Sequence, residues 1–74
     1  MTTRNLDLTV LRDGKREDRF QVHGDPEDIT WLTGRLTGWL QGRRWHERTW
    51  DQFEITAHEH GHTGTPPISK ARTP

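Results

Sequence analysis

The chain has 74 residues, of which 27% are hydrophobic and none is cysteine. This length sets an upper limit of one domain, and the shortage of apolar residues predicts a marginal core that oligomerisation would help to stabilise. Eleven basic residues balance eleven acidic ones, which argues against a nucleic-acid binder that relies on general electrostatic attraction. The lack of cysteine excludes disulfides, thiolate metal sites and cysteine nucleophiles.

The sequence carries no signal for secretion or for a membrane. Residues 1–9, MTTRNLDLT, have no apolar core of the kind found in a secretory signal. No apolar run approaches the roughly 20 residues that a membrane-spanning helix needs. We therefore expect a cytoplasmic protein with no membrane partner.

Two strands joined by a turn open the predicted fold. In residues 5–12 apolar side chains alternate with polar ones, and residues 16–23 repeat this alternation. Asp13 and Gly14 lie between the two segments and are a strong turn signal. The sequence therefore predicts a hairpin with one apolar face. The side chains of that face are Leu6, Leu8, Val10, Phe20 and Val22.

The length of the turn sets which side chains face each other across the hairpin. A two-residue turn pairs Leu8 with Arg19 and so places an apolar residue opposite a polar one. A three-residue loop over residues 12–14, with its glycine as a bulge residue, pairs Leu6 with Phe20 and keeps the apolar faces together. We therefore predict the three-residue loop.

Residues 25–42, DPEDITWLTGRLTGWLQG, predict one helix with both ends marked. Asp25 suits the N-cap, and Pro26 suits the first helical position, where a missing N–H has no cost. Gly42 suits a left-handed residue at the carboxyl end. The apolar residues follow the helical period and predict a stripe that packs on the hairpin. This stripe consists of Ile29, Leu32, Leu36, Trp39 and Leu40.

The remainder of the chain predicts a third strand and a tail. Residues 45–57 read as the strand, with clear apolar alternation from Phe53 to Ala57. Residues 60–74 hold three of the four prolines and few apolar residues, which predicts a flexible tail. The predicted fold is therefore α+β. It is a β-β-α-β domain over residues 1–59, with a three-stranded antiparallel sheet of order 2-1-3 and one helix on one face.

The side of the helix that faces away from the stripe is the first candidate for partner binding. It carries Trp31, Gly34 and Gly38. An interior glycine costs roughly 1 kcal/mol relative to alanine, so two of them suggest a surface that a partner approaches closely, with Trp31 at the contact. The alternative is a weak helix with exposed glycines and a partly buried tryptophan.

The sheet face opposite the helix is the second candidate. In the predicted register a tryptophan lies there among arginines and glutamines, and such a group suits a protein partner or a stacked base. The alternative is a solvated face on which the tryptophan packs against arginine stems. The residues that we assign to partner binding on this face are Arg19, Arg48, Trp50 and Gln52.

Three histidines at alternating positions, His58, His60 and His62, form the only metal-binding pattern. Imidazole is a good ligand for Zn²⁺, Ni²⁺ or Cu²⁺. However, the spacing along a strand is wide for a single ion, and a tail offers no outer groups to orient the rings. We therefore predict no structural metal site and no cofactor, with opportunistic metal binding by these histidines as an alternative.

The sequence gives no support for catalysis. It has no nucleophile motif and no glycine-rich phosphate loop between a strand and a helix, so we predict no catalytic residues. Our main hypothesis is a small non-enzymatic interaction module that acts by protein–protein contact, as a homodimer or bound to a partner. The alternatives are a nucleic-acid-binding regulator that uses Arg19, Arg48 and Trp50, and metal binding by the histidine segment.

Overall fold

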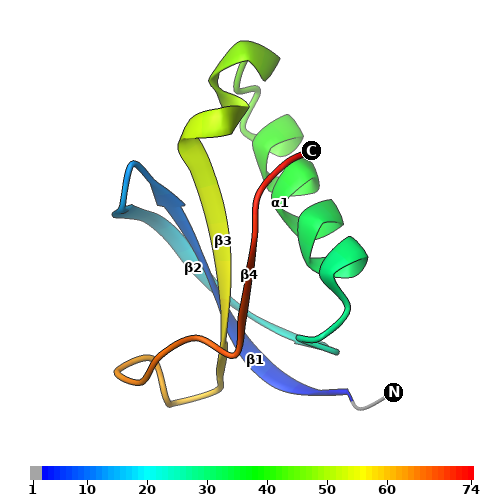
Figure 1. The fold of residues 1–74 in the computed structure, drawn as a ribbon, viewed down its shortest axis with the longest axis vertical. Coiled ribbons are helices and arrows are strands. Elements are labelled where there is room, and N and C mark those ends of the chain that lie inside the picture. The colour runs from blue at the N-terminus through cyan, green and yellow to red at the C-terminus, as the bar shows by residue number, and fades with distance from the viewer. Residues whose placement is uncertain (1–2) are drawn as a thin grey trace.

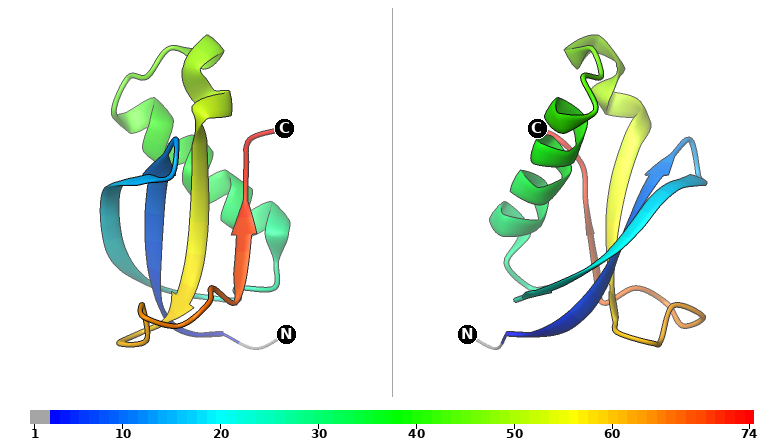
Figure 2. Two further views of the ribbon diagram at one scale, coloured as in Figure 1. Left: turned by 60° about the vertical axis from the view of Figure 1, so that its left-hand side comes forward. Right: turned by 180° about the vertical axis from the view of Figure 1, so that it is seen from behind.

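Residues 3–74, which the computed structural model describes, form an α+β fold of four strands, one α-helix and one 3₁₀ helix (Figure 1). The sheet is antiparallel with the order β2-β1-β3-β4, and α1 lies on one of its faces (Figure 2). The predicted order 2-1-3 is therefore confirmed, and β4 extends it by one strand. The elements are β1 (Arg4–Arg12), β2 (Lys15–Gly24), α1 (Ile29–Gly42), the 3₁₀ helix η1 (Glu47–Gln52), β3 (Phe53–Glu59) and β4 (Ser69–Ala71).

Within residues 3–74, no helix combines the length and the apolar character that crossing a membrane requires.

The core is a single layer of side chains between α1 and the inner face of the sheet. Leucines of α1 meet alternate residues of β1 and β3, and Ala71 closes the layer on the β4 side. Ile29, which we predicted in the buried stripe, is the first residue of the helix and is 48% exposed. The fully buried core side chains are Leu6, Leu8, Val10, Leu32, Leu36, Leu40, Phe53, Ile55 and Ala57.

The turn between β1 and β2 has two residues, so the predicted three-residue loop is wrong. Arg12 pairs directly with Lys15, and between them Asp13 and Gly14 have φ angles of 50° and 82°. Positive φ at both central residues is typical of a type I′ turn, whose twist matches that of the flanking strands.

A β-bulge in β2 keeps the apolar faces together in spite of the short turn. The register shifts after Val10, and Glu17 is left without a partner on β1. Because one extra residue reverses the faces of a strand, Leu8 then lies opposite Phe20. The prediction that the apolar side chains of both strands share one face is correct. The extra residue that makes this possible lies within β2 and not in the loop.

The helix begins later than predicted, with Asp28 as its N-cap in place of Asp25. The Asp28 carboxylate accepts a hydrogen bond of 3.0 Å from the backbone N–H of Trp31. Asp25 instead accepts a hydrogen bond from the backbone N–H of Glu27 (3.0 Å), and its carbonyl accepts one from Asp28 (3.2 Å). Residues 25–28 thus form a turn that leads into the helix.

The carboxyl end of the helix has a Schellman motif with an arginine in the left-handed position. Gly42 is the last helical residue, whereas Arg44 has a φ of 60°. The backbone N–H of Arg44 donates to the carbonyl of Gln41 (3.0 Å), and that of Trp45 donates to Leu40 (3.1 Å). This is the hydrogen-bond pattern of the motif, and the prediction that Gly42 is the left-handed residue is wrong.

The third strand is shorter than predicted because a 3₁₀ helix precedes it. The strand predicted over residues 45–57 begins only at Phe53, after η1. The ring of His46 caps η1, since its Nδ1 accepts a hydrogen bond from the backbone N–H of Arg48 (3.2 Å). Residues 47–52 therefore do not belong to the sheet.

The segment predicted as a tail contains β4. Ser69 and Ala71 pair with β3, and Ala71 is only 7% exposed. The hydroxyl of Ser69 donates to the carbonyl of Pro26, which ties β4 to the turn before α1. A strand of three residues is too short to produce a recognisable alternation, so the prediction of three strands missed it. The flexibility expected for the rest of residues 60–74 stays a prediction.

We expect Arg44→Gly to raise the free energy of unfolding by roughly 1 kcal/mol, because a side chain in the left-handed region is strained and glycine is not. Urea unfolding of the variant measures this change. Gln41→Gly, at an exposed position within α1, is the matched control and should lower stability by about 1 kcal/mol. If Arg44→Gly lowered the free energy of unfolding as much as Gln41→Gly does, this account of the helix end would be wrong.

Candidate functional site

The structure separates the residues that we predicted to form one surface on the back of α1. Trp31 is half-buried and packs over Gly24 at the end of β2, where a Cβ atom would overlap its ring. Gly34 and Gly38 are exposed, and a Cβ at either position would meet no other atom within 4 Å. Trp31 therefore has a packing role within the chain, whereas the two glycines do not. Partner binding by these residues stays a prediction.

Substitution of the glycines should separate these roles. Gly34→Ala and Gly38→Ala should each stabilise the protein by up to about 1 kcal/mol, because alanine favours the helix and the space is open. Gly24→Ala should destabilise it by about 1–3 kcal/mol, because the new methyl group displaces the Trp31 ring. Thermal unfolding of the three variants checks both signs. A stabilised Gly24→Ala variant would show that Trp31 does not depend on this contact.

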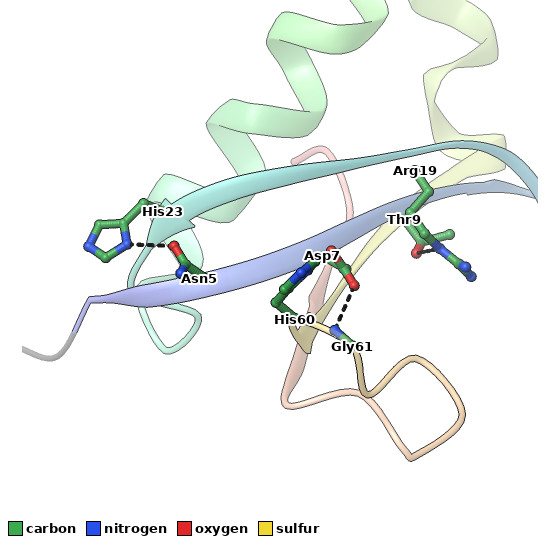
Figure 3. A network of polar contacts seen from close by, with 7 residues as sticks. All are labelled: Asn5, Asp7, Thr9, Arg19, His23, His60 and Gly61. Atoms are coloured by element: carbon green, nitrogen blue, oxygen red, sulfur yellow. Dashed lines mark hydrogen bonds and ion pairs between the residues drawn. The ribbon is translucent and has the colours of Figure 1, made fainter.

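The outer face of the sheet, opposite α1, is polar. Asp7 and Thr9 of β1 lie between Gln21 and Arg19 of β2 on one side and strand β3 on the other. The guanidinium of Arg19 donates from Nε to the hydroxyl of Thr9 (3.2 Å), and Thr9 is buried (Figure 3). Of the four residues predicted to bind a partner here, the structure places Arg19 on this face.

The other three residues lie on η1, so their predicted place on the sheet is wrong. The indole of Trp50 is half-buried against the core, and its Nε1 donates to the carbonyl of Trp45 (3.0 Å). The side chain of Gln52 accepts a hydrogen bond from Nε of Arg12 (3.0 Å). Arg48 is exposed. The tryptophan that the nucleic-acid hypothesis placed beside Arg19 is therefore at another part of the molecule.

A carboxylate–histidine pair holds the loop after β3 against the outer face (Figure 3). Asp7 accepts one hydrogen bond from Nδ1 of His60 (2.9 Å) and another from the backbone N–H of Gly61 (3.1 Å). The bond from His60 lowers the pKa of the Asp7 carboxyl below its ordinary value of 3.8, and the bond from Gly61 lowers it further.

The three predicted metal-binding histidines have different surroundings. His58 is 8% exposed and donates from Nε2 to the carbonyl of Thr65 (3.0 Å), while His60 donates to Asp7 and His62 is exposed. The argument that these rings lack orienting partners is therefore wrong for two of them. Within residues 3–74, no group of three or more histidine, cysteine or acidic side chains is placed to hold a metal ion.

Replacement of Asp7 tests the pair that holds this loop. Asp7→Asn should lower the free energy of unfolding at neutral pH by about 1–2 kcal/mol, because hydrogen bonds to a charged group are lost. Since the pKa of Asp7 is lower in the folded chain than in the unfolded one, its contribution is complete above about pH 4 and is lost as the pH falls through the folded pKa. The stability gap between wild type and variant should therefore narrow in acid.

Urea unfolding of both proteins from about pH 2 to pH 7 measures this gap. Asp13→Asn is the matched control and should remain close to wild type at neutral pH, because asparagine suits the type I′ turn as well as aspartate does. A gap between wild type and Asp7→Asn that stays constant in acid would show that the carboxylate charge contributes nothing.

A groove between α1 and the carboxyl-terminal segment is a hollowed feature that the sequence analysis missed. It consists of three adjoining pockets of about 370, 290 and 560 Å³ in the described chain. The first two share Ile29, Thr33 and Arg72, and the second and third share Pro74. We call this feature the α1–β4 groove. Its remaining lining residues are Thr30, Thr37, Glu47, Trp50, Asp51, Glu54, Lys70, Ala71 and Thr73.

Apolar groups are exposed in and beside this groove. Among the described residues, Ile29 (48%) and Ile68 (39%) are the exposed large hydrophobic side chains. Ile29 lines the groove, and Ile68 directly precedes β4. Trp50 lines the opposite end. The only signal in the sequence was Ile68, a single isoleucine after two prolines. It does not indicate a groove unless the pairing of β4 with β3 is known.

A scan against models of protein families finds no match, and searches among curated proteins and among solved structures find none either. A function for this chain therefore has to be inferred from its geometry. The outer face is largely occupied by its own hydrogen bonds, whereas the α1–β4 groove combines open space with exposed apolar side chains.

Proposed function

We propose that the protein is a small non-enzymatic interaction module that binds a protein partner in the α1–β4 groove. The observation that supports this proposal is the exposure of Ile29 in a groove that Trp50 also lines. Apolar groups in a concave site are typical of binding surfaces.

The walls of the groove suit a polypeptide. Threonines at positions 30, 33 and 37 line the helix side, and residues 70–74 line the other side. Hydroxyl groups beside Ile29 offer hydrogen bonds to a peptide. Charged residues line the groove as well, among them Arg72 and Glu54, which pair at 3.4 Å. The groove therefore presents apolar, hydroxyl and charged groups to a partner.

The proposal keeps the predicted class of function but moves its site. The sequence analysis placed binding on the back of α1 or on the outer sheet face, and Trp50 is the one predicted residue that lines the groove. A nucleic-acid partner has less support, because Trp50 and Arg48 lie on η1 while Arg19 lies on the sheet and bonds to Thr9. We further propose the cytoplasmic location that the sequence analysis predicted.

Site-specific photo-crosslinking in the cell of origin tests the site. A benzophenone amino acid at Thr30, an exposed residue that lines the groove, should yield a crosslinked protein partner. The same group at Gln21, which is exposed on the outer sheet face, should yield none and is the matched control. A third position, Gly34, reports on the back of the helix. Crosslinks from Gln21 or Gly34 but not from Thr30 would contradict the groove as the binding site.

A further inference from the structure

We propose that the partner adds an extended segment to the free edge of β4 and places an acidic side chain opposite Lys70. This inference rests on the proposed function, since it names how the groove is filled. An extended segment that joins a sheet edge gains backbone hydrogen bonds for affinity and uses alternate side chains for specificity. The inference therefore has two parts, the pairing of backbones and the charge of one residue.

The two edges of the sheet differ in what lies beside them. The outer strand at one edge is β2, where residues 15–19 are all charged and a bulge interrupts the ladder at Glu17. Charges and bulges are the usual devices that block further pairing. The other edge is β4 (Figure 2), which lies beside the groove and follows the exposed Ile68. β4 also carries such devices, since it has only three residues with Lys70 at its centre. Its position beside the groove is therefore the reason to expect the partner strand at β4.

The side chains of β4 divide between the two faces of the sheet. Ser69 and Ala71 pair with Ala57 and Ile55 of the core, whereas Lys70 pairs with Thr56 on the outer face. A strand added beside β4 continues this alternation. Its residue opposite Lys70 points to the outer face, and the residues on either side of it point to the inner face, where Ile29 is exposed.

Charge selects the residue opposite Lys70. Arg72 is already paired with Glu54, at 3.4 Å, but Lys70 takes part in no ion pair within residues 3–74. Opposite charges that face each other across a sheet are favourable, and like charges are unfavourable. A glutamate or aspartate is thus the complement of Lys70. Small or β-branched apolar residues beside it suit the inner face and the groove.

The same rule argues against a second copy of this chain as the occupant. Two copies that paired through β4 about a two-fold axis centred on this strand would place Lys70 opposite the same lysine. That contact is repulsive. The charge of β4 therefore favours a different, acidic partner segment over self-association.

Synthetic peptides of defined sequence test the inference on the full chain. The probes are Thr-Val-Glu-Val-Thr and its matched control Thr-Val-Lys-Val-Thr, with binding followed by amide chemical shifts. We expect shifts centred on residues 68–72 and about fivefold tighter binding of the glutamate peptide. Lys70→Glu should reverse this preference. N-methylation of alternate peptide amides should abolish binding, since it removes the backbone donors but keeps the side chains.

A failure of the strand addition can be distinguished from a failure of the groove as the binding site. If Thr30 crosslinks a partner but neither peptide shifts the β4 amides, the strand addition is wrong and the groove still stands as the site. If Lys70→Glu leaves the preference between the peptides unchanged, the charge assignment is wrong. A concentration-dependent dimer that Lys70→Thr strengthens would identify a second copy as the occupant and overturn the inference.

Discussion

Burial of the leucines of α1 against the apolar face of the sheet is the interaction on which the other elements depend. Leu32, Leu36 and Leu40 recur every four residues and are fully buried, so they present one continuous ridge. β1 and β3 are the inner strands of the sheet, and their alternate side chains belong to the same buried cluster as this ridge. Because a chain of this length can bury only one thin layer, each neighbouring strand has to turn its apolar face toward the same layer. The bulge at Glu17 is the local distortion that achieves this for β2.

The thin layer also explains why the tryptophans surround the core. Trp39 and Trp45 flank Phe53, with ring centroids 5.8 and 5.2 Å from it. The indole of Trp39 donates to the carboxylate of Asp18 (2.8 Å), which lowers the pKa of that group. Trp50 likewise donates to a backbone carbonyl. A tryptophan whose indole N–H is hydrogen-bonded can pack its large ring at the margin of a small core. These residues therefore contribute to the packing of the fold.

The segment after β3 links the outer face of the sheet to the groove. Asp7 binds the start of the loop through His60 and Gly61, and His58 binds its middle through the carbonyl of Thr65. The loop then returns along β3 as β4, whose Ser69 is tied to the turn before α1. These contacts come from residues far apart in the chain, and together they set the position of the strand that forms one wall of the α1–β4 groove.

Sequence patterns alone determined the features that depend on short-range periodicity. The alternation in residues 5–12 and 53–57, the Asp13-Gly14 turn signal and the leucine stripe of α1 specify the hairpin, the helix, the antiparallel order 2-1-3 and nearly all of the core. Tertiary contacts decided the rest. A local sequence pattern does not distinguish a bulge in the loop from a bulge in the strand, nor Asp25 from Asp28 as the N-cap. Three residues are also too few to signal β4, and the groove requires both β4 and the helix to be in place, so only the folded chain brings Ile29, Lys70 and Trp50 to one surface.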